Sequence, residues 1–119
     1  MDNSAENQTQ NIRAIIDVGS NSVKLLVAEV ADGVVTPLVH EGEQTRLGRG
    51  VFETGQLASE AIADTARVVA DFAAKAKGHG AASVHVLATS AAREATNGDE
   101  LVAAISAGGL ELEIIDGQT

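Results

Sequence analysis

The segment over residues 15–30, IIDVGSNSVKLLVAEV, constrains the fold most, because two apolar runs flank a short polar segment. Runs of Val, Ile and Leu bounded by Gly, Asn and Ser are typical of β-strands joined by a tight turn. We therefore predict a strand over residues 13–17, buried on both faces, and a second strand over residues 23–30, paired as a hairpin. The polar residues between them, 17–22, include a carboxylate and two serines that a turn alone does not require.

A third strand, over residues 34–40, is predicted to follow directly. Asp32-Gly33 is a strong hairpin signal between the second and third strands. Pro37 lies inside the third strand and cannot donate to a β-ladder, so this strand is expected at an edge of the sheet. Residues 41–55 contain several glycines and are predicted as a loop.

Helical periodicity begins at Ser59, the predicted N-cap of a helix over residues 59–77, in which apolar residues recur every three or four positions. Gly78 ends this helix. The remaining elements are predicted as a strand, two short helices and a strand, over residues 84–88, 91–95, 100–107 and 110–115, with Thr89-Ser90 and Asp99 as the caps of the two helices. The order β-β-β-α-β-α-α-β predicts one α/β lobe with a mixed five-stranded sheet and helices packed on it.

Charge and composition argue against several classes of function. The formal net charge is −9, and the eight Lys and Arg residues are scattered with 2% aromatic residues, so we expect no nucleic-acid binding. No apolar run approaches the roughly 18 residues of a membrane helix, so we expect no membrane partner. The absence of cysteine fits a cytoplasmic location. Residues 1–11 are polar and are predicted as a disordered leader before a lobe over residues 12–119.

The polar segment after the first strand is the first candidate site. Gly19, Ser20, Asn21 and Ser22 would present backbone N–H groups and side-chain donors to one point, as anion-binding loops do. Asp17 beside them would repel a bare phosphate, so its presence points to a divalent cation such as Mg²⁺. A hairpin turn held by side-chain-to-backbone hydrogen bonds explains the same residues equally well.

A second candidate site follows the strand over residues 84–88. Thr89 and Ser90 place hydroxyl and N–H groups at a predicted helix N-terminus, at the carboxyl end of a strand, where α/β proteins usually bind anions. Arg93 lies in the first turn of that helix and its guanidinium can fork onto phosphate oxygens. Ordinary helix capping, with Arg93 paired to Glu94 or solvated, is the alternative.

The glycine-rich loop over residues 44–50, QTRLGRG, is the third candidate. Arg46 and Arg49 in this loop either line the path of a polyanion or remain solvated loop charges, and both interpretations fit the sequence. The sequence contains neither a P-loop motif nor a visible Ser/His/Asp set for nucleophilic catalysis.

Four stretches together resemble the N-terminal lobe of the exopolyphosphatase and guanosine pentaphosphate phosphohydrolase family: DVGSNSVKLLVAEV, TRLGRGVFETGQLASEAIA, VLATSAAREATNGDELVAAI and LELEIIDG. The resemblance implies a ribonuclease H-like lobe of the actin-like ATPase type, with a second lobe that this sequence lacks. It also implies that water releases the terminal phosphate of inorganic polyphosphate or guanosine pentaphosphate, assisted by Mg²⁺ or another divalent cation.

The resemblance also implies a role for individual residues. Asp17 would lie near the metal, and Arg93 would act in catalysis on the phosphate chain. The implied phosphate-binding residues are Gly19, Ser20, Asn21, Ser22, Arg46, Thr89 and Ser90. Arg46 matches an R-L-G loop of the family.

Half of such a site lies outside the sequence. The family has a water-activating glutamate just after the last strand and a second glycine-rich loop in the following lobe, and the sequence stops at Thr119. We therefore expect the chain alone to hydrolyse polyphosphate negligibly. We also expect an exposed apolar face where a second lobe would dock, through which a homodimer would be able to form. Two other functions remain open: a kinase or ATPase of the same superfamily, and a non-catalytic nucleotide-sensing or interaction module.

Overall fold

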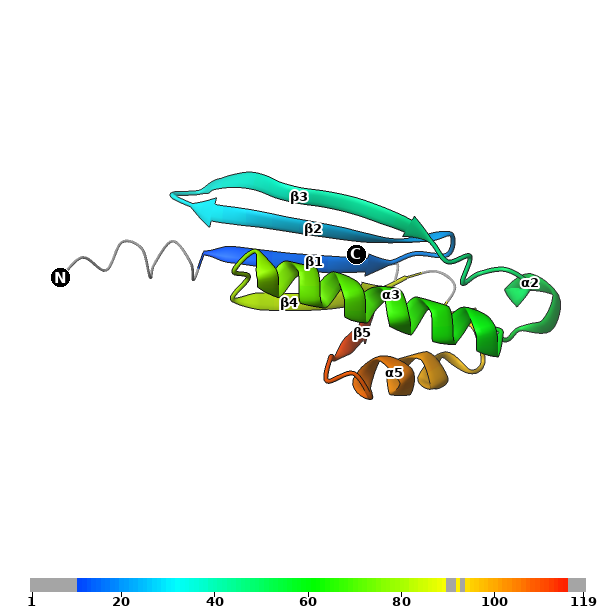
Figure 1. Ribbon diagram of the computed structural model, residues 1–119. Coiled ribbons are helices and arrows are strands. Elements are labelled where there is room, and N and C mark those ends of the chain that lie inside the picture. The colour runs from blue at the N-terminus through cyan, green and yellow to red at the C-terminus, as the bar shows by residue number, and fades with distance from the viewer. Residues whose placement is uncertain (1–10, 90–91, 93, 116–119) are drawn as a thin grey trace.

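The computed structural model describes residues 11–89, 92 and 94–115, which form a five-stranded sheet packed against helices (Figure 1). In chain order the elements are β1 (Ile12–Val18), β2 (Ser22–Ala31), β3 (Val34–Gln44), α2 (Val51–Thr54), α3 (Ser59–Gly78), β4 (Ser83–Ala88), α5 (Gly98–Ser106) and β5 (Leu112–Ile114). The strand order across the sheet is β3-β2-β1-β4-β5. β1, β2 and β3 pair antiparallel, whereas β4 pairs parallel with both β1 and β5. The predicted mixed sheet is confirmed. The predicted leader lies outside the described residues, except for Asn11.

The two hairpins turn for different local reasons. Asp32 and Gly33 both have positive φ, 53° and 78°, as the type I′ turn of an Asp-Gly hairpin requires. At the β1–β2 turn the N–H of Gly19 donates to the carbonyl of Ser22 at 2.9 Å. A Cβ at Gly19 would lie 3.1 Å from that carbonyl oxygen, so the tight turn favours glycine there.

The predicted loop over residues 41–55 is wrong at both ends. β3 continues to Gln44 because the long strand β2 offers it pairing partners up to Ser22, and residues 51–54 form the short helix α2. The predicted N-cap is also displaced: Ser59 is the first helical residue, and the N-cap is Ala58, which has no side-chain cap hydrogen bond.

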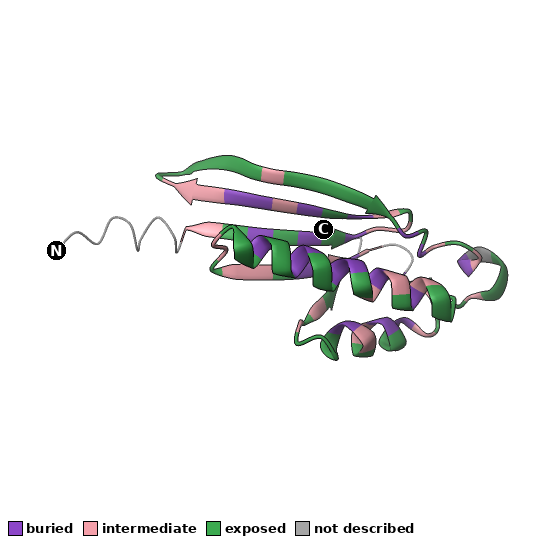
Figure 2. Ribbon diagram, in the orientation of Figure 1, coloured by how far each residue is buried: buried purple, intermediate pink, exposed green. Residues whose placement is uncertain are grey.

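The core lies between α3 and the face of β1 formed by Ala14, Ile16 and Val18, which are almost fully buried (Figure 2). α3 turns a continuous buried stripe toward this face because its apolar residues recur at helical spacing. The buried residues of α3 are Ile62, Thr65, Val68, Val69, Phe72, Ala73 and Ala76. Each fully buried Val, Leu or Ile contributes about 1.5–3 kcal/mol relative to an exposed one, so this interface dominates the stability of the lobe.

The prediction that the first strand is buried on both faces is wrong. Burial alternates along β1, and Arg13, Ile15 and Asp17 are exposed. Ile15 is 42% exposed because, among the described elements, α3 packs only on the opposite face of β1. The side chain of Asp17 therefore stands on the open face of the sheet. Among the residues described, no helix combines the length and apolar character needed to cross a membrane.

Candidate functional site

The loops that follow β1 and β4 begin side by side at one edge of the sheet. β1 and β4 are parallel neighbours, and their last residues, Val18 and Ala88, are partners in the register. The N–H of Thr89 donates to the carbonyl of Val18 at 3.4 Å. Gly19 and Thr89 thus start adjacent loops at the carboxyl ends of two strands. Ser90 and Arg93 of the second candidate site lie outside the described residues.

The turn between β1 and β2 presents free donors at this edge. Within the part of the chain that the structure describes, the N–H groups of Ser20 and Asn21 donate to no protein acceptor. Ser20 and Ser22 are half-buried and Asn21 is exposed, so their polar atoms border solvent. An exposed pair of successive N–H groups beside hydroxyl and amide side chains has the donor set of a phosphate-binding loop.

The loop after β3 is bonded to this turn through its backbone. The N–H groups of Thr45 and Arg46 both donate to the carbonyl of Asn21, at 3.1 and 3.0 Å. The N–H of Gly48 donates to the carbonyl of Ser20 at 2.8 Å. Arg46 has φ 52°, a left-handed conformation that is uncommon for arginine. The structure thus brings the third candidate segment into direct contact with the first.

Asp17 has a basic neighbour that the sequence analysis missed. Lys24 on β2 is the register partner of Asp17 across the sheet, and both side chains are exposed on the open face. No ion pair within 4 Å joins them in the described residues. The tight turn at residues 20–21 fixes the strand register, so the pairing of Asp17 with Lys24 was readable from the sequence.

The donors near Asp17 suit a magnesium ion that is shared with a ligand. Mg²⁺ in proteins is commonly held by one or two carboxylates, with water and substrate phosphates completing its shell. Asp17 supplies one exposed carboxylate at the end of β1, and Ser20 and Ser22 follow in the adjoining turn. The described residues contain no cluster of three or more His, Asp or Glu side chains able to hold a metal by themselves. A metal at Asp17 would therefore depend on phosphate oxygens and water for its remaining ligands.

The end of the second candidate segment supports the fold. Asn97 accepts a hydrogen bond at Oδ1 from the N–H of Leu57 at 2.7 Å and donates from Nδ2 to the carbonyl of Leu57 at 3.0 Å. The N–H and the hydroxyl of Thr96 both donate to the carbonyl of Gly55, at 2.8 and 3.1 Å. A Cβ at Gly98 would lie 2.6 Å from the carbonyl oxygen of Ala92, so this position requires glycine. These bonds hold residues 96 and 97 against residues 55–57, just before α3.

A hollow of about 650 Å³ lies beside the loop after β3, lined by Thr45, Arg46, Arg49 and the first turns of α3 from Ala58 to Asp64. Asp64 in its wall is already paired with Arg67, at 2.8 Å. The pKa of Arg67 is raised by its hydrogen bond to Asp64, by the charge of Asp64, and further by Glu43 and Asp71. A second hollow of about 540 Å³, along β4 and residues 109–113, is lined by no Lys or Arg and does not suit a polyanion.

The chain is similar in sequence to proteins named exopolyphosphatases. The Ppx/GppA phosphatase family model matches residues 26–119. Exopolyphosphatase 2 of Mycobacterium tuberculosis is 42% identical over 90 residues, which cover 72% of this chain and 28% of that protein. A putative exopolyphosphatase of Haemophilus influenzae is 34% identical over 112 residues, covering 92% of this chain and 35% of that protein.

Solved structures share the fold. The crystal structure of the Ppx/GppA family member from Aquifex aeolicus superposes with a TM-score of 0.85 at 32% identity, covering 90% of this chain and 35% of that one. Ethanolamine utilization protein EutJ of Carboxydothermus hydrogenoformans, at 17% identity and a TM-score of 0.50, shares the fold alone. The fold is thus a ribonuclease H-like lobe of the actin-like ATPase type, as predicted. The chain spans about a third of the length of these relatives, 28–35%. It belongs to the Ppx/GppA phosphatase family.

Proposed function

We propose that this chain is the phosphate-binding lobe of an exopolyphosphatase, which releases terminal phosphate from inorganic polyphosphate. Guanosine pentaphosphate is a second substrate of the same chemical class, because both end in a phosphoanhydride. The observation that carries the proposal is that the loops after β1 and β4 begin side by side at one edge of the sheet, where the N–H groups of Ser20 and Asn21 have no acceptor among the described residues. The similarity to proteins named exopolyphosphatases supports this substrate class.

The residues at this edge would stabilise negative charge on the terminal phosphate. Transfer of a phosphoryl group to water depends mainly on positioning and on charge neutralisation. In our proposal the Ser20 and Asn21 N–H groups and the hydroxyls of Ser22 and Thr89 donate to the terminal phosphate. Lys24 and Arg93 would add positive charge near its oxygens, and Gly19 keeps the turn tight. A divalent cation bound by Asp17 would neutralise further charge and orient the phosphate oxygens.

The other half of the reaction is assigned to the second lobe. A glutamate that activates the attacking water belongs, by the family resemblance, to the part of the relatives that this chain does not span. Closure of a second lobe over the substrate would exclude bulk water. We therefore expect the 119-residue chain to bind polyphosphate and to hydrolyse it negligibly. Phosphate release at the rate of a two-lobed relative would contradict this division of roles.

Calorimetric titration of the chain with polyphosphate, guanosine pentaphosphate and ATP, with and without Mg²⁺, tests the proposal. We expect polyphosphate to bind, and chelation of Mg²⁺ to weaken binding markedly. Binding of ATP with no response to polyphosphate would instead favour a kinase or ATPase lobe. Binding of a guanosine nucleotide alone would favour a sensing module.

A two-lobed protein that contains this sequence tests the role of Arg93. Its guanidinium is proposed to neutralise charge in the transition state, so Arg93→Ala is expected to lower kcat/KM at least about tenfold. Unchanged steady-state kinetics would remove Arg93 from the site. A cytoplasmic location and a homodimer remain predictions from the sequence.

A further inference from the structure

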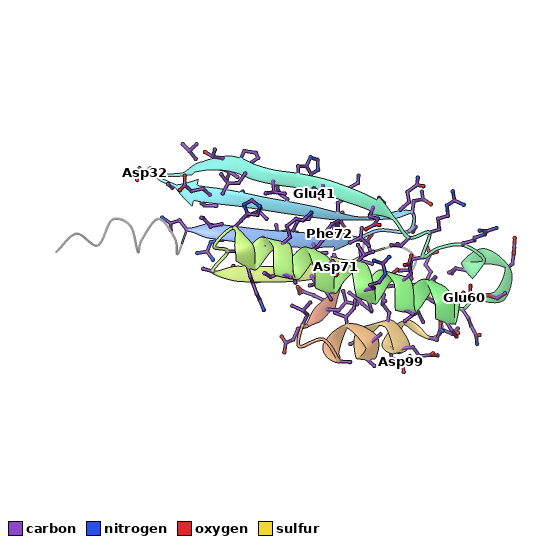
Figure 3. All side chains as sticks on the ribbon, in the orientation of Figure 1. Asp32, Glu41, Glu60, Asp71, Phe72 and Asp99 are labelled. Atoms are coloured by element: carbon purple, nitrogen blue, oxygen red, sulfur yellow. The ribbon has the colours of Figure 1, made fainter. Side chains whose placement is uncertain are left out.

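The hollow between the loop after β3 and the start of α3 has two arginines in its wall and adjoins the phosphate-binding edge. Arg46 and Arg49 line it from the loop side, and the first turns of α3 close the other side. The loop that lines the hollow is hydrogen-bonded to the β1–β2 turn, because the N–H of Arg46 donates to the carbonyl of Asn21. Figure 3 shows Glu60 on the first turn of α3, at the end of the helix that borders this loop.

Both guanidinium groups are uncommitted within the described part of the chain. Arg46 and Arg49 are exposed, and their side chains make no hydrogen bond or ion pair there. By contrast, Arg67 and Lys75 are each paired with a carboxylate. In a chain of net charge −9, these two guanidinium groups concentrate positive charge on the loop side of the hollow, opposite Glu60 and Asp64.

Thr45 lines the same hollow, but its hydroxyl oxygen is itself buried. Thr45 is 7% exposed, and its Oγ1 has no hydrogen-bond partner among the described residues. Because Oγ1 has almost no accessible surface, it does not contribute to binding in the hollow. The N-cap of α3, Ala58, offers no side-chain acceptor to the first-turn N–H groups beside it. The first-turn N–H groups of α3 and the guanidinium groups of Arg46 and Arg49 together point to an anionic ligand in the hollow.

We propose that this hollow is a second anion subsite, which holds the part of a linear phosphate chain that extends beyond the phosphate at the β1–β2 turn. Arg49 is the side chain that gives the subsite its affinity, together with Arg46 on the side of the turn. The inference rests on the proposed function, because it assigns the longer part of the same substrate.

The carboxylates in the wall set the position of the chain. Glu60 faces the hollow without an ion pair in the described structure, whereas Asp64 is paired with Arg67. A phosphate chain would therefore lie on the arginine side, away from Glu60. Two neutralising substitutions should therefore change the affinity for long-chain polyphosphate in opposite directions. Neutralising Arg49 should lower this affinity, and neutralising Glu60 should raise it.

The test is calorimetric titration of the 119-residue chain at fixed Mg²⁺ with pyrophosphate, tripolyphosphate and long-chain polyphosphate. Arg49→Gln should lower the affinity for long-chain polyphosphate relative to pyrophosphate by about tenfold, the loss of one charge-assisted hydrogen bond. Glu60→Gln should raise the same ratio about twofold. Arg49→Lys should give an intermediate ratio, because lysine keeps the charge and loses the planar fork.

Lys77→Gln is the matched control. It removes the same charge at the far end of α3, about 25 Å from Glu60 along the helix, which exceeds the screening length of ~8 Å. The affinity ratio of this variant should stay within about twofold of the unaltered chain. Thermal unfolding of each variant confirms that the lobe remains folded.

The outcomes separate the subsite from the proposed function. Normal binding of pyrophosphate with a ratio that is unchanged in Arg49→Gln, or an equal loss at every chain length, would overturn the subsite and leave the proposed function standing. Failure of the unaltered chain to bind any of the three phosphates would contradict the proposed function and the subsite with it.

Discussion

The face of the sheet beneath α3 and the edge at the end of β1 differ in how far their side chains are buried and their backbone donors are paired. On the covered face, Ile16, Leu25 and Val27 have no exposed surface. At the edge, Ser20 and Asn21 keep backbone donors that no described protein group accepts. Burial on the covered face stabilises the lobe, whereas in our proposal the unpaired donors at the edge serve a ligand, so stability and binding lie in separate regions.

The largest expected effect on stability is from Leu101→Ala. Leu101 on α5 is fully buried in the core, and its truncation should lower the free energy of unfolding by about 2–5 kcal/mol. Ile15→Ala on the open face is the control, because Ile15 is 42% exposed and should cost about 1 kcal/mol or less. Urea denaturation of both variants gives the two values. Equal losses would show that the open face is buried in solution.

Gly98→Ala is expected to have the next largest effect on stability, because its Cβ would lie 2.6 Å from the carbonyl oxygen of Ala92. Relief of this clash requires a backbone shift and should cost about 1–3 kcal/mol. Gly78→Ala is matched to it, since a Cβ there meets nothing within 4 Å, and should be neutral or slightly stabilising. Thermal unfolding compares the pair, and an undiminished Tm in Gly98→Ala would show that the close approach is absent.

Asn97→Ala should cost about 1–3 kcal/mol, because it leaves the N–H and the carbonyl of Leu57 without partners. Asn97→Asp keeps the acceptor and loses the donor, so its loss should be smaller than that of Asn97→Ala. Hydrogen exchange at the amide of Leu57 reports the broken bond directly. An unchanged exchange rate in Asn97→Ala would show that this clamp does not form.

The smallest expected effect is at the ion pair of Lys75 with Glu41, whose Nζ–Oε1 distance is 2.7 Å. Both side chains are more than a third exposed, 43% and 42%, so Lys75→Ala should cost about 0.2–1 kcal/mol. Lys77→Ala on the same helix is the control without a pair. The difference between the two should shrink in high salt. A loss of unfolding free energy well above this range would show that the ion pair of Lys75 with Glu41 is not exposed to solvent.

Local sequence signals predicted the strands, the long helix and the hairpin at Asp32-Gly33, because periodicity and turn chemistry act over a few residues. The mixed sheet and the edge position of β3 were also predicted, from the alternation of elements and from Pro37, whereas the strand order across the sheet was not. The sequence analysis did not predict that β1 is open on one face, because burial depends on which elements pack there. It also did not predict the Asn97 clamp on Leu57, which joins residues 40 apart in the chain.

The candidate site was predicted in part. The two candidate segments were found from their residue types, but the parallel pairing of β1 with β4 that brings their first residues together was not predicted. The attachment of Arg46 to the β1–β2 turn was not predicted, because backbone hydrogen bonds between loops leave no pattern in the residue types. The position of Lys24 beside Asp17 was available from the hairpin register and was overlooked.

The central claim is that the loops after β1 and β4 bind phosphate together, and amide chemical-shift mapping of the ¹⁵N-labelled chain tests it most directly. Titration with tripolyphosphate and Mg²⁺ is predicted to shift the amides of Ser20, Asn21, Ser22 and Thr89 in parallel, with a single dissociation constant. Shifts confined to one of these loops, or centred on the far end of α3 near Lys77, would contradict the account.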